Sequence, residues 1–206
     1  MNKFKSSILF VLTLIFFTLT TQVYAQPKNG RVSNEALNAT EIASLLFMRE
    51  EEKMARDVYI KMYGAWNDSV FDNIASSEQE HMDAIKVLLD KYNLTDPVID
   101  SIGVFNDPEL QHQYDELLES GEISHMEGLR VGALIEEVDM QDIQEAIDTI
   151  ENEDMISTYE SLLKGSRNHL RSFVGKIEEQ GVVYEAQLLT QEEVDAIVDS
   201  PIERGR

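Results

Sequence analysis

The sequence predicts an all-α protein, a four-helix bundle in which one long crossover connection carries a short helix. Three observations support this fold class. Four long segments repeat apolar residues at steps of three and four, the period of a helix face that packs against a core. Residues that cap or break helices bound each segment. Sustained alternation of apolar and polar residues, which indicates a half-buried strand, is not found in the sequence.

The first two long helices are expected to form a pair. The first extends over about residues 39–63, after an Asn38 cap, and should end at Gly64, because glycine commonly follows the last helical turn. The second extends over about residues 69–93 and is followed by an Asp-Pro turn at 96–97. The short loop between these helices makes them antiparallel neighbours.

The second pair of long helices follows a long connection, residues 94–123. This connection contains a predicted short helix at 108–119, which begins with proline, a residue that helices tolerate at their first position. The third long helix begins after a Ser124 cap and extends to about residue 151, and the fourth extends over about 153–180. Two helical pairs joined by one long crossover are typical of ferritin-like bundles. The alternative is an irregular all-α domain.

Three parts are expected along the chain. Residues 1–25 combine a short basic start, an apolar stretch and a small-residue cleavage pattern that ends at Ala25, which is typical of a secretory signal peptide. The apolar stretch is short for a membrane span, although an uncleaved anchor is the alternative. Residues 26–37 form a flexible polar lead-in, and residues 38–200 form the helical domain, with a short C-terminal helix at 190–199. The protein is therefore expected to be exported, and to be periplasmic or secreted.

Charge and cysteine content exclude several function classes. The formal net charge is −22, and cleavage of the signal peptide would make it two units more negative, because two lysines and no acids lie there. Nucleic acids and anionic membrane surfaces are therefore not expected partners. The chain has no cysteine, which excludes disulfides, thiolate metal sites and thiol catalysis. The ligand types that remain are carboxylates and four histidines.

A glutamate and a histidine interrupt the apolar face of the second helix. Glu78 and His81 fall on one stripe at helical spacing. The apolar members of that stripe are Phe71, Ile74, Ile85 and Leu88. Burial of an unpaired charge is costly, so both side chains need a partner.

Each of the other three long helices repeats this feature. Glu52 lies in the apolar stripe of the first, Glu136 with Asp139 one turn later in that of the third, and His169 in that of the fourth. A pair of divalent metal ions explains the recurrence, because carboxylates bridge such ions and imidazoles complete their coordination. Helical positions i and i+3 face the same point, so a Glu-x-x-His helix supplies two ligands, as in carboxylate di-iron bundles.

Several of these residues have alternative interpretations. Glu78 and His81 could lie on a solvated face or form a hydrogen-bonded pair. Glu52 could form a buried ion pair, Glu136 could exchange roles with its neighbour, and His169 could be a hydrogen-bonded core histidine. The partners considered are Arg56 or Arg167 for Glu52, Glu137 in place of Glu136, and Tyr59 or Tyr159 for His169.

Four sequence motifs resemble a known family. They are MREEEKMARDVY, SEQEHMDAI, GALIEEVDMQDI and GSRNHLRSF. Together they resemble the domain-of-unknown-function family 2202 of the ferritin-like superfamily, over roughly residues 35–195. More distantly, the first two motifs resemble the ligand helices of rubrerythrins, in which a liganding glutamate is followed three residues later by Ala-Arg, and in which the next helix carries Glu-x-x-His.

The rubrerythrin resemblance implies a ligand set and two departures from it. The implied ligands are Glu52, Glu78, His81, Glu136 and His169, with Asp139 as the second acid of the third helix. The fourth helix carries Ser166 where the resemblance implies a bridging glutamate. Either Asp139, Glu137 or water replaces that glutamate, or the second metal ion is bound more weakly. A cysteine-rich electron-transfer module is also missing from the sequence.

The resemblance implies an iron centre, with manganese or another divalent metal as the alternative. The reaction it favours is reduction of peroxide or oxidation of ferrous iron, with oxygen or peroxide as the reactant and an external electron donor as the partner. Assembly into a homo-oligomer is a further expectation. Insertion into a membrane after processing is not expected. The alternative function is a non-catalytic metal-binding or helical interaction module.

Overall fold

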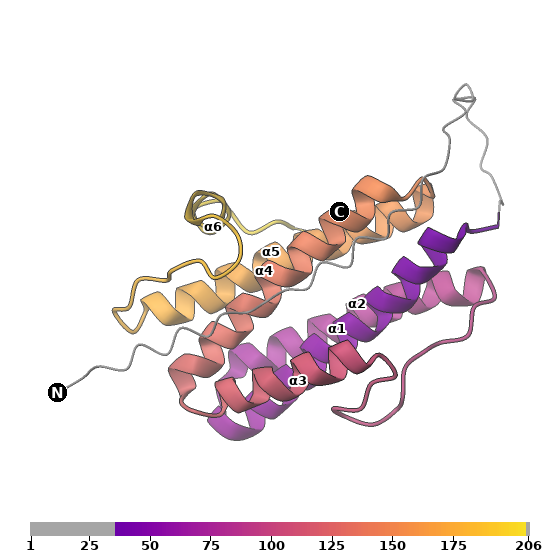
Figure 1. Ribbon diagram of the computed structural model, residues 1–206. Helices are drawn as coiled ribbons and strands as arrows, with labels where there is room; N and C mark the ends of the chain where they lie inside the picture. Colours follow the sequence, from indigo (N-terminus) through magenta and orange to yellow (C-terminus); the bar gives the residue numbers. More distant parts are fainter. Residues whose placement is uncertain (1–35, 205–206) are drawn as a thin grey trace. The chain divides into compact units, whose positions relative to one another are not determined.

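A computed structural model describes residues 36–204 of the chain (Figure 1). These residues form six helices and no strand, so the predicted all-α bundle is confirmed. The helices are α1 (Ala39–Trp66), α2 (Ser69–Lys91), α3 (Pro108–Gly121), α4 (His125–Thr149), α5 (Glu153–Glu178) and α6 (Gln191–Val198). The predicted signal peptide, and all but the last two residues of the predicted lead-in, lie outside the described residues.

The helix caps agree with the sequence, with one correction. At the start of α1, Asn38 and Glu41 form a reciprocal capping box. The predicted end of this helix at Gly64 is wrong, because α1 continues for one further turn. The residue that ends it is Asn67, whose φ of 51° supplies the left-handed conformation of a helix C-cap.

The long helices pack as two pairs. In Figure 1, α1 lies along α2 and α4 lies along α5, as expected from their short connecting loops. The crossover between the pairs brings α3 against both α1 and α4, and α6 packs on α5. The arrangement is compatible with a ferritin-like bundle.

The hydrophobic core consists of two clusters of buried side chains. One contains Tyr59, Phe71 and Phe173, and the other contains Leu45 and Ile85. Each long helix contributes to both clusters, from its two ends. On α1, α2 and α5, the polar residues predicted as ligands lie between the clusters, whereas on α4 Glu136 and Asp139 lie among members of the first cluster.

A buried lysine attaches the crossover to α1. The ammonium group of Lys53 is fully buried and donates hydrogen bonds to Asp57 (2.6 Å) and to the carbonyl oxygen of Ser101 (2.9 Å). Its Nζ also lies 4.2 Å from the centre of the Phe105 ring. The carboxylate of Asp57 accepts a further bond from the backbone N–H of Gly103 (2.9 Å). Each buried charge thus has hydrogen-bonding partners, which offsets the cost of its burial.

A buried glutamate on α4 attaches the connection between α5 and α6. Glu137 accepts hydrogen bonds from the Tyr184 hydroxyl (2.6 Å) and from the backbone N–H groups of Gln187 (3.1 Å), Leu188 (2.6 Å) and Leu189 (2.8 Å). These contacts occupy its carboxylate on the side of α4 that faces the C-terminal segment. Glu137 is therefore a structural anchor.

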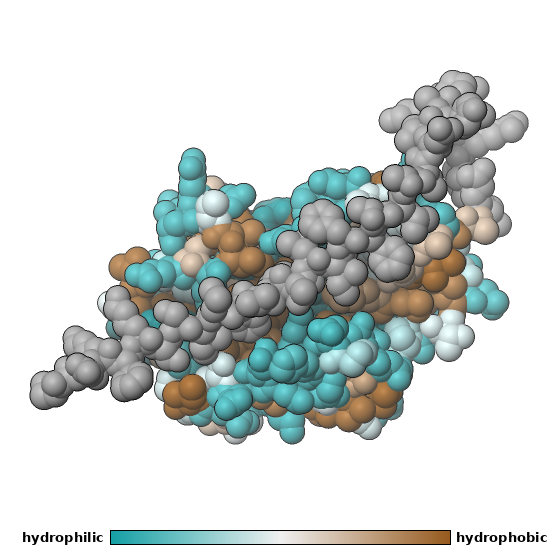
Figure 2. Space-filling view, in the orientation of Figure 1, coloured by the Kyte–Doolittle hydropathy of each residue, from teal (hydrophilic) through white to brown (hydrophobic). Residues whose placement is uncertain are grey.

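Polar and apolar residues both reach the face of the molecule drawn in Figure 2. Hydrophilic residues cover most of the visible face of α3 in Figure 2. None of the helices within residues 36–204 is long and apolar enough to cross a membrane.

Candidate metal centre

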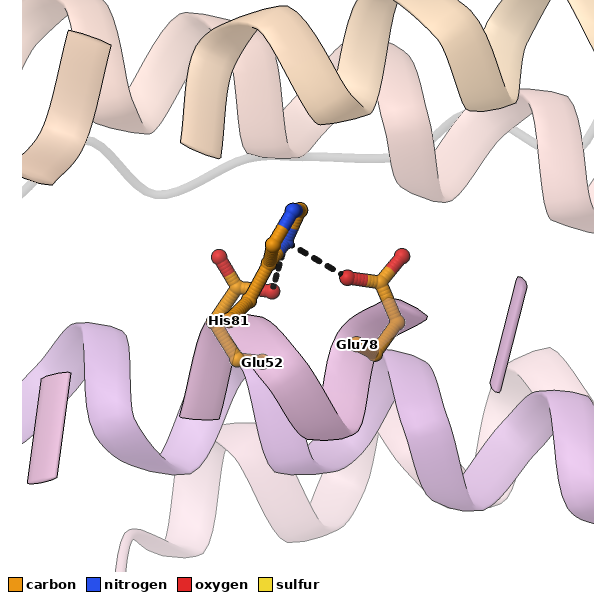
Figure 3. Close-up of side chains that lie close together, drawn as sticks. All are labelled: Glu52, Glu78 and His81. Atoms are coloured by element: carbon orange, nitrogen blue, oxygen red, sulfur yellow. Dashed lines mark hydrogen bonds and ion pairs between the residues drawn. The ribbon is translucent and has the colours of Figure 1, made fainter. Parts of the chain in front are cut away.

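Helices α1 and α2 bring three of the predicted ligands together. Glu52 extends from α1, and Glu78 and His81 extend from successive turns of α2 (Figure 3). The Nδ1 atom of His81 lies 3.2 Å from Glu52 Oε2 and 2.8 Å from Glu78 Oε2. All three residues are buried. The two carboxylates thus converge on one ring nitrogen.

Helices α4 and α5 supply a second group around the same glutamate. The Nδ1 atom of His169 lies 2.9 Å from Glu78 Oε1 and 3.3 Å from Glu136 Oε2. Glu78 therefore presents a different oxygen to each histidine. The rings of His81 and His169 are stacked, with their centroids 5.4 Å apart. The result is two triads that share one central carboxylate.

The geometry within the triads differs from that of ordinary ion pairs. The buried Nδ1 atom of His169 has no hydrogen-bond partner among the described residues, although two carboxylate oxygens lie near it, because neither is aligned with an N–H bond. The buried Oε1 atom of Glu52 also has no partner there. In each triad, the atoms that could bind a metal lie within 4.8 Å of one another. Unpaired buried groups that converge in this way fit a metal ion shared between them.

The electrostatics of the metal-free site depend on its two histidines. Burial alone would raise the pKa of Glu78, but the charges of His169 and His81 outweigh it and hold this pKa well below its usual value. Burial likewise opposes the charge of His169, yet the carboxylates of Glu78 and Glu136 raise its pKa to about 10. Burial raises the pKa of Glu52 to about 7, against the opposing charge of His81. Without metal, protonated imidazoles therefore neutralise the central carboxylate.

Asp139 lies beside the triads but belongs to neither. Its Oδ2 atom accepts a hydrogen bond from the hydroxyl of Ser166, which is fully buried on α5. Burial raises the pKa of Asp139, and the charges of Glu52 and Glu136 add to this effect. Asp139 therefore bonds to Ser166, the residue at the position where the resemblance to rubrerythrins implies a bridging glutamate.

Comparison with known proteins identifies the family of this chain. A family model described as "Uncharacterized protein domain (DUF2202)" matches residues 41–201. The chain belongs to the DUF2202 family. The resemblance to rubrerythrins, and membership of the ferritin-like superfamily, stay predictions.

Two similar proteins extend the comparison of this DUF2202 chain. "Uncharacterized protein MJ0754" of Methanocaldococcus jannaschii is 47% identical over 172 residues, which cover 83% of this chain and 93% of that protein. A crystal structure of hypothetical protein MJ0754 from Methanococcus jannaschii is similar to this fold, with a TM-score of 0.79 and 45% identity. The similarity covers 87% of this chain and all of that structure.

In this DUF2202 domain, the arginines considered as partners of Glu52 and the tyrosines considered as partners of His169 form hydrogen bonds with other residues. The partners are Asp57 and Gln79 for Arg56, Glu203 for Arg167, Glu136 for Tyr59 and Ser44 for Tyr159. Glu137, the alternative to Glu136, anchors the C-terminal segment. Glu52 thus has no arginine partner within the described residues, and His169 bonds to neither tyrosine.

Two residues, Tyr59 and Ser77, support the triads by hydrogen bonds and were not predicted to do so. Tyr59 donates a hydrogen bond to Glu136 Oε1 (2.5 Å). The Oγ atom of Ser77 lies 2.8 Å from Nε2 of His169. An N–H at Nε2 that donates to Ser77 leaves the Nδ1 lone pair free for a metal.

Gly165 leaves room for the ring of His81. A Cβ atom at this position would lie 2.3 Å from His81 Nε2, closer than any real contact of that kind. A glycine inside a helix costs stability relative to alanine, so its presence on a buried face indicates a steric need. The sequence shows a glycine at position 165, but it does not show that the ring of His81 needs the space beside it.

Proposed function

We propose that this DUF2202 protein binds a pair of transition-metal ions between its four long helices, and that the pair is iron. We further propose that it reduces peroxide or oxidises ferrous iron there. The observation that supports the site is the position of Glu78, whose two oxygens face two different histidines in two buried triads.

The donor set fits such a pair. Glu52 and His81 would hold one ion, Glu136 and His169 would hold the other, and Glu78 would bridge them. Mixed carboxylate and imidazole donors suit iron, manganese and zinc better than magnesium or calcium. When bound, iron would supply the electron transfer and Lewis acidity that either reaction needs.

The chain's own residues prepare the site for these ions. The hydrogen bond from Tyr59 holds Glu136 in position, and Ser77 favours the His169 tautomer with a free Nδ1. Burial of the triads limits the access of bulk water. Because both histidines have raised pKa values in the metal-free protein, metal binding must displace their protons.

The choice of reaction rests on the resemblance of the first two motifs to rubrerythrins. Since the chain has no cysteine, electrons would come from a separate donor protein or small molecule. Export, which depends on residues 1–25, is part of this proposal.

Metal analysis combined with one pair of variants tests the proposal. The processed protein, loaded with ferrous iron under anaerobic conditions, should contain two ions per chain. Glu78→Gln should remove both, whereas Glu80→Gln, an exposed glutamate two residues away on α2, should retain them. Equal metal contents in the two variants would overturn the site.

The reaction is tested separately on the loaded protein. Addition of hydrogen peroxide, with a small-molecule reductant present, should lead to turnover that Glu78→Gln lacks and Glu80→Gln keeps. Oxygen uptake on addition of ferrous iron tests the ferrous-oxidation branch. If two ions bind but neither assay shows turnover, the protein is a non-catalytic metal-binding module.

A further inference from the structure

A surface cleft lies between the C-terminal end of α5 and the short helix α6, which packs on it (Figure 1). The volume of this cleft is about 80 Å³, which is enough space for several water-sized groups. Residues of both helices and of the connection between them line it. No residue of the two metal triads is among them, so the cleft is separate from the proposed metal centre.

The interior of the cleft is apolar. Val174 of α5 and Val194 of α6 are both buried members of the first core cluster, and Val198 packs against that cluster. Val183, from the connection between the helices, also lines the cleft, although the residue is 79% exposed. An apolar group that entered the cleft would remove valine surface from water, which is favourable.

Carboxylates line the same cleft, and no basic residue does. The three acids are all exposed, and within the described residues none of them forms an ion pair. They are Glu178, Asp195 and Asp199. The carboxylate of Asp195 accepts a hydrogen bond from the neutral side chain of Gln191 (2.8 Å). The charges of these acids are therefore available to a positively charged ligand.

The ends of the two helices add to this negative potential. Helix α5 ends at Glu178 and α6 ends at Val198, and both residues line the cleft. The C-terminal end of a helix carries a partial negative charge that favours a cation nearby. The last turn of α6 contains no basic residue, and Lys176 in the last turn of α5 pairs with Asp68 (3.5 Å).

We propose that this cleft binds a lysine side chain of a partner protein. The four-carbon stem of lysine suits the valine-lined interior, and its ammonium group would lie among the exposed carboxylates. A protein segment fits better than a free amine, because Val183 is exposed beside the cleft and can contact the residues next to the lysine. The formal net charge of −22 would also attract a basic partner. This interaction surface goes beyond the proposed function and does not depend on it.

Two short peptides test the cleft on the processed protein without metal. One contains a single lysine between two alanines, and the other contains norleucine in its place, which keeps the four-carbon stem and removes the charge. In nuclear magnetic resonance spectra, the lysine peptide should shift the methyl signals of Val174, Val194 and Val198. The norleucine peptide should bind roughly tenfold more weakly, since several exposed carboxylates each contribute modestly. The ion n-butylammonium, which corresponds to the side chain alone, should also bind more weakly than the lysine peptide.

Variants of the acids distinguish the cleft from general attraction by a negative protein. Glu178→Gln and Asp199→Asn should each weaken binding of the lysine peptide by roughly two- to fivefold. Glu192→Gln, at an exposed position of α6 that does not line the cleft, should leave it unchanged.

Several results would overturn the inference and leave the proposed function intact. They are an absence of methyl shifts, equal affinities of the lysine and norleucine peptides, and equal effects of Glu178→Gln and Glu192→Gln. Binding of n-butylammonium as tightly as the lysine peptide would also overturn it, because the ligand would then be a free amine.

Discussion

At the residue scale, the two histidines are supported in different ways. The ring of His81 packs against the backbone of α5 at Gly165, whereas His169 is held by a hydrogen bond from its far nitrogen to Ser77. One support is steric and the other is electronic. Changes to them should therefore affect metal binding through different physical effects.

Substitution of Gly165 by alanine should weaken metal binding at His81. The added Cβ would overlap Nε2 of this ring and push Nδ1 away from the carboxylates. Gly175→Ala is the matched control, because a Cβ there meets nothing within 4 Å on the same helix. The control should gain roughly 0.5–1 kcal/mol of unfolding free energy from helix propensity. Zinc titration of both variants is the measurement, and equal affinities would contradict the steric role of Gly165.

Substitution of Ser77 by alanine should lower metal affinity at His169 by roughly 10- to 100-fold, the usual effect of losing a residue that orients a ligand. Ser77→Thr should restore binding, since it keeps the hydroxyl. Ser76→Ala is the control, because the Ser76 hydroxyl bonds only to the backbone of its own helix. Nitrogen-15 chemical shifts of the imidazole in the zinc-loaded protein, where the His169 ring has lost its second proton, report the tautomer directly. An unchanged shift in Ser77→Ala would show that Ser77 does not set it.

At the scale of elements, the helices and most of the centre were predictable from the sequence. A polar residue within an apolar stripe is a strong signal, and it identified Glu52, Glu78 and His169, which the structure brings together. The choice between Glu136 and Glu137 was not predictable, because adjacent helical positions differ by only part of a turn. A segment some fifty positions later in the chain settles it by binding Glu137.

The roles of Ser77, Gly165 and Lys53 could not be predicted, for a related reason. Each depends on a side chain or loop that approaches from another part of the chain, and helical periodicity carries no information about that neighbour. Lys53 is the clearest case. Its ammonium group is buried under the crossover rather than exposed to solvent, because three acceptors in α1 and the crossover surround it.

Removal of the Lys53 charge should weaken the attachment of the crossover to α1. Lys53→Met leaves Arg56 as the remaining cation beside the buried Asp57 carboxylate. Since a buried charge left without any partner costs roughly 3–5 kcal/mol, the unfolding free energy should fall by less than this amount. Lys61→Met, an exposed lysine on the same helix, should change stability little. Urea unfolding measures both. Equal midpoints for the two variants would mean that the crossover does not depend on this contact.

At the scale of the whole molecule, the centre makes stability depend on pH. The pKa of His169 is 6.5 in an unperturbed chain and about 10 in the folded protein, so its charge stabilises the folded state fully below pH 6.5. This stabilisation is lost as the pH rises from 6.5 through 10. Glu52 has a pKa of about 7 in the folded protein and 4.5 in an unperturbed chain. Between these two pH values the folded state keeps a proton that the unfolded chain has lost, so stability also falls as the pH rises.

The metal-free protein should therefore unfold at a lower temperature at pH 9 than at pH 6. Metal binding replaces the imidazole protons, so the loaded protein should lack this decrease above pH 7. Thermal unfolding followed by circular dichroism, with and without zinc, measures both. A metal-free protein that becomes more stable over this range would contradict the assigned charges of the histidines.

The two hydrophobic clusters have a consequence for how the molecule unfolds. Carboxylates and imidazoles lie between them on three of the long helices, α1, α2 and α5, so few apolar side chains connect the two halves of the bundle there; Leu163 packs against both clusters. Metal ions bound by residues of all four helices should therefore make the two halves of the bundle open together rather than separately. Hydrogen–deuterium exchange of backbone amides should then give different opening free energies for the two ends of the bundle without metal, and the same, larger opening free energy for both ends with metal.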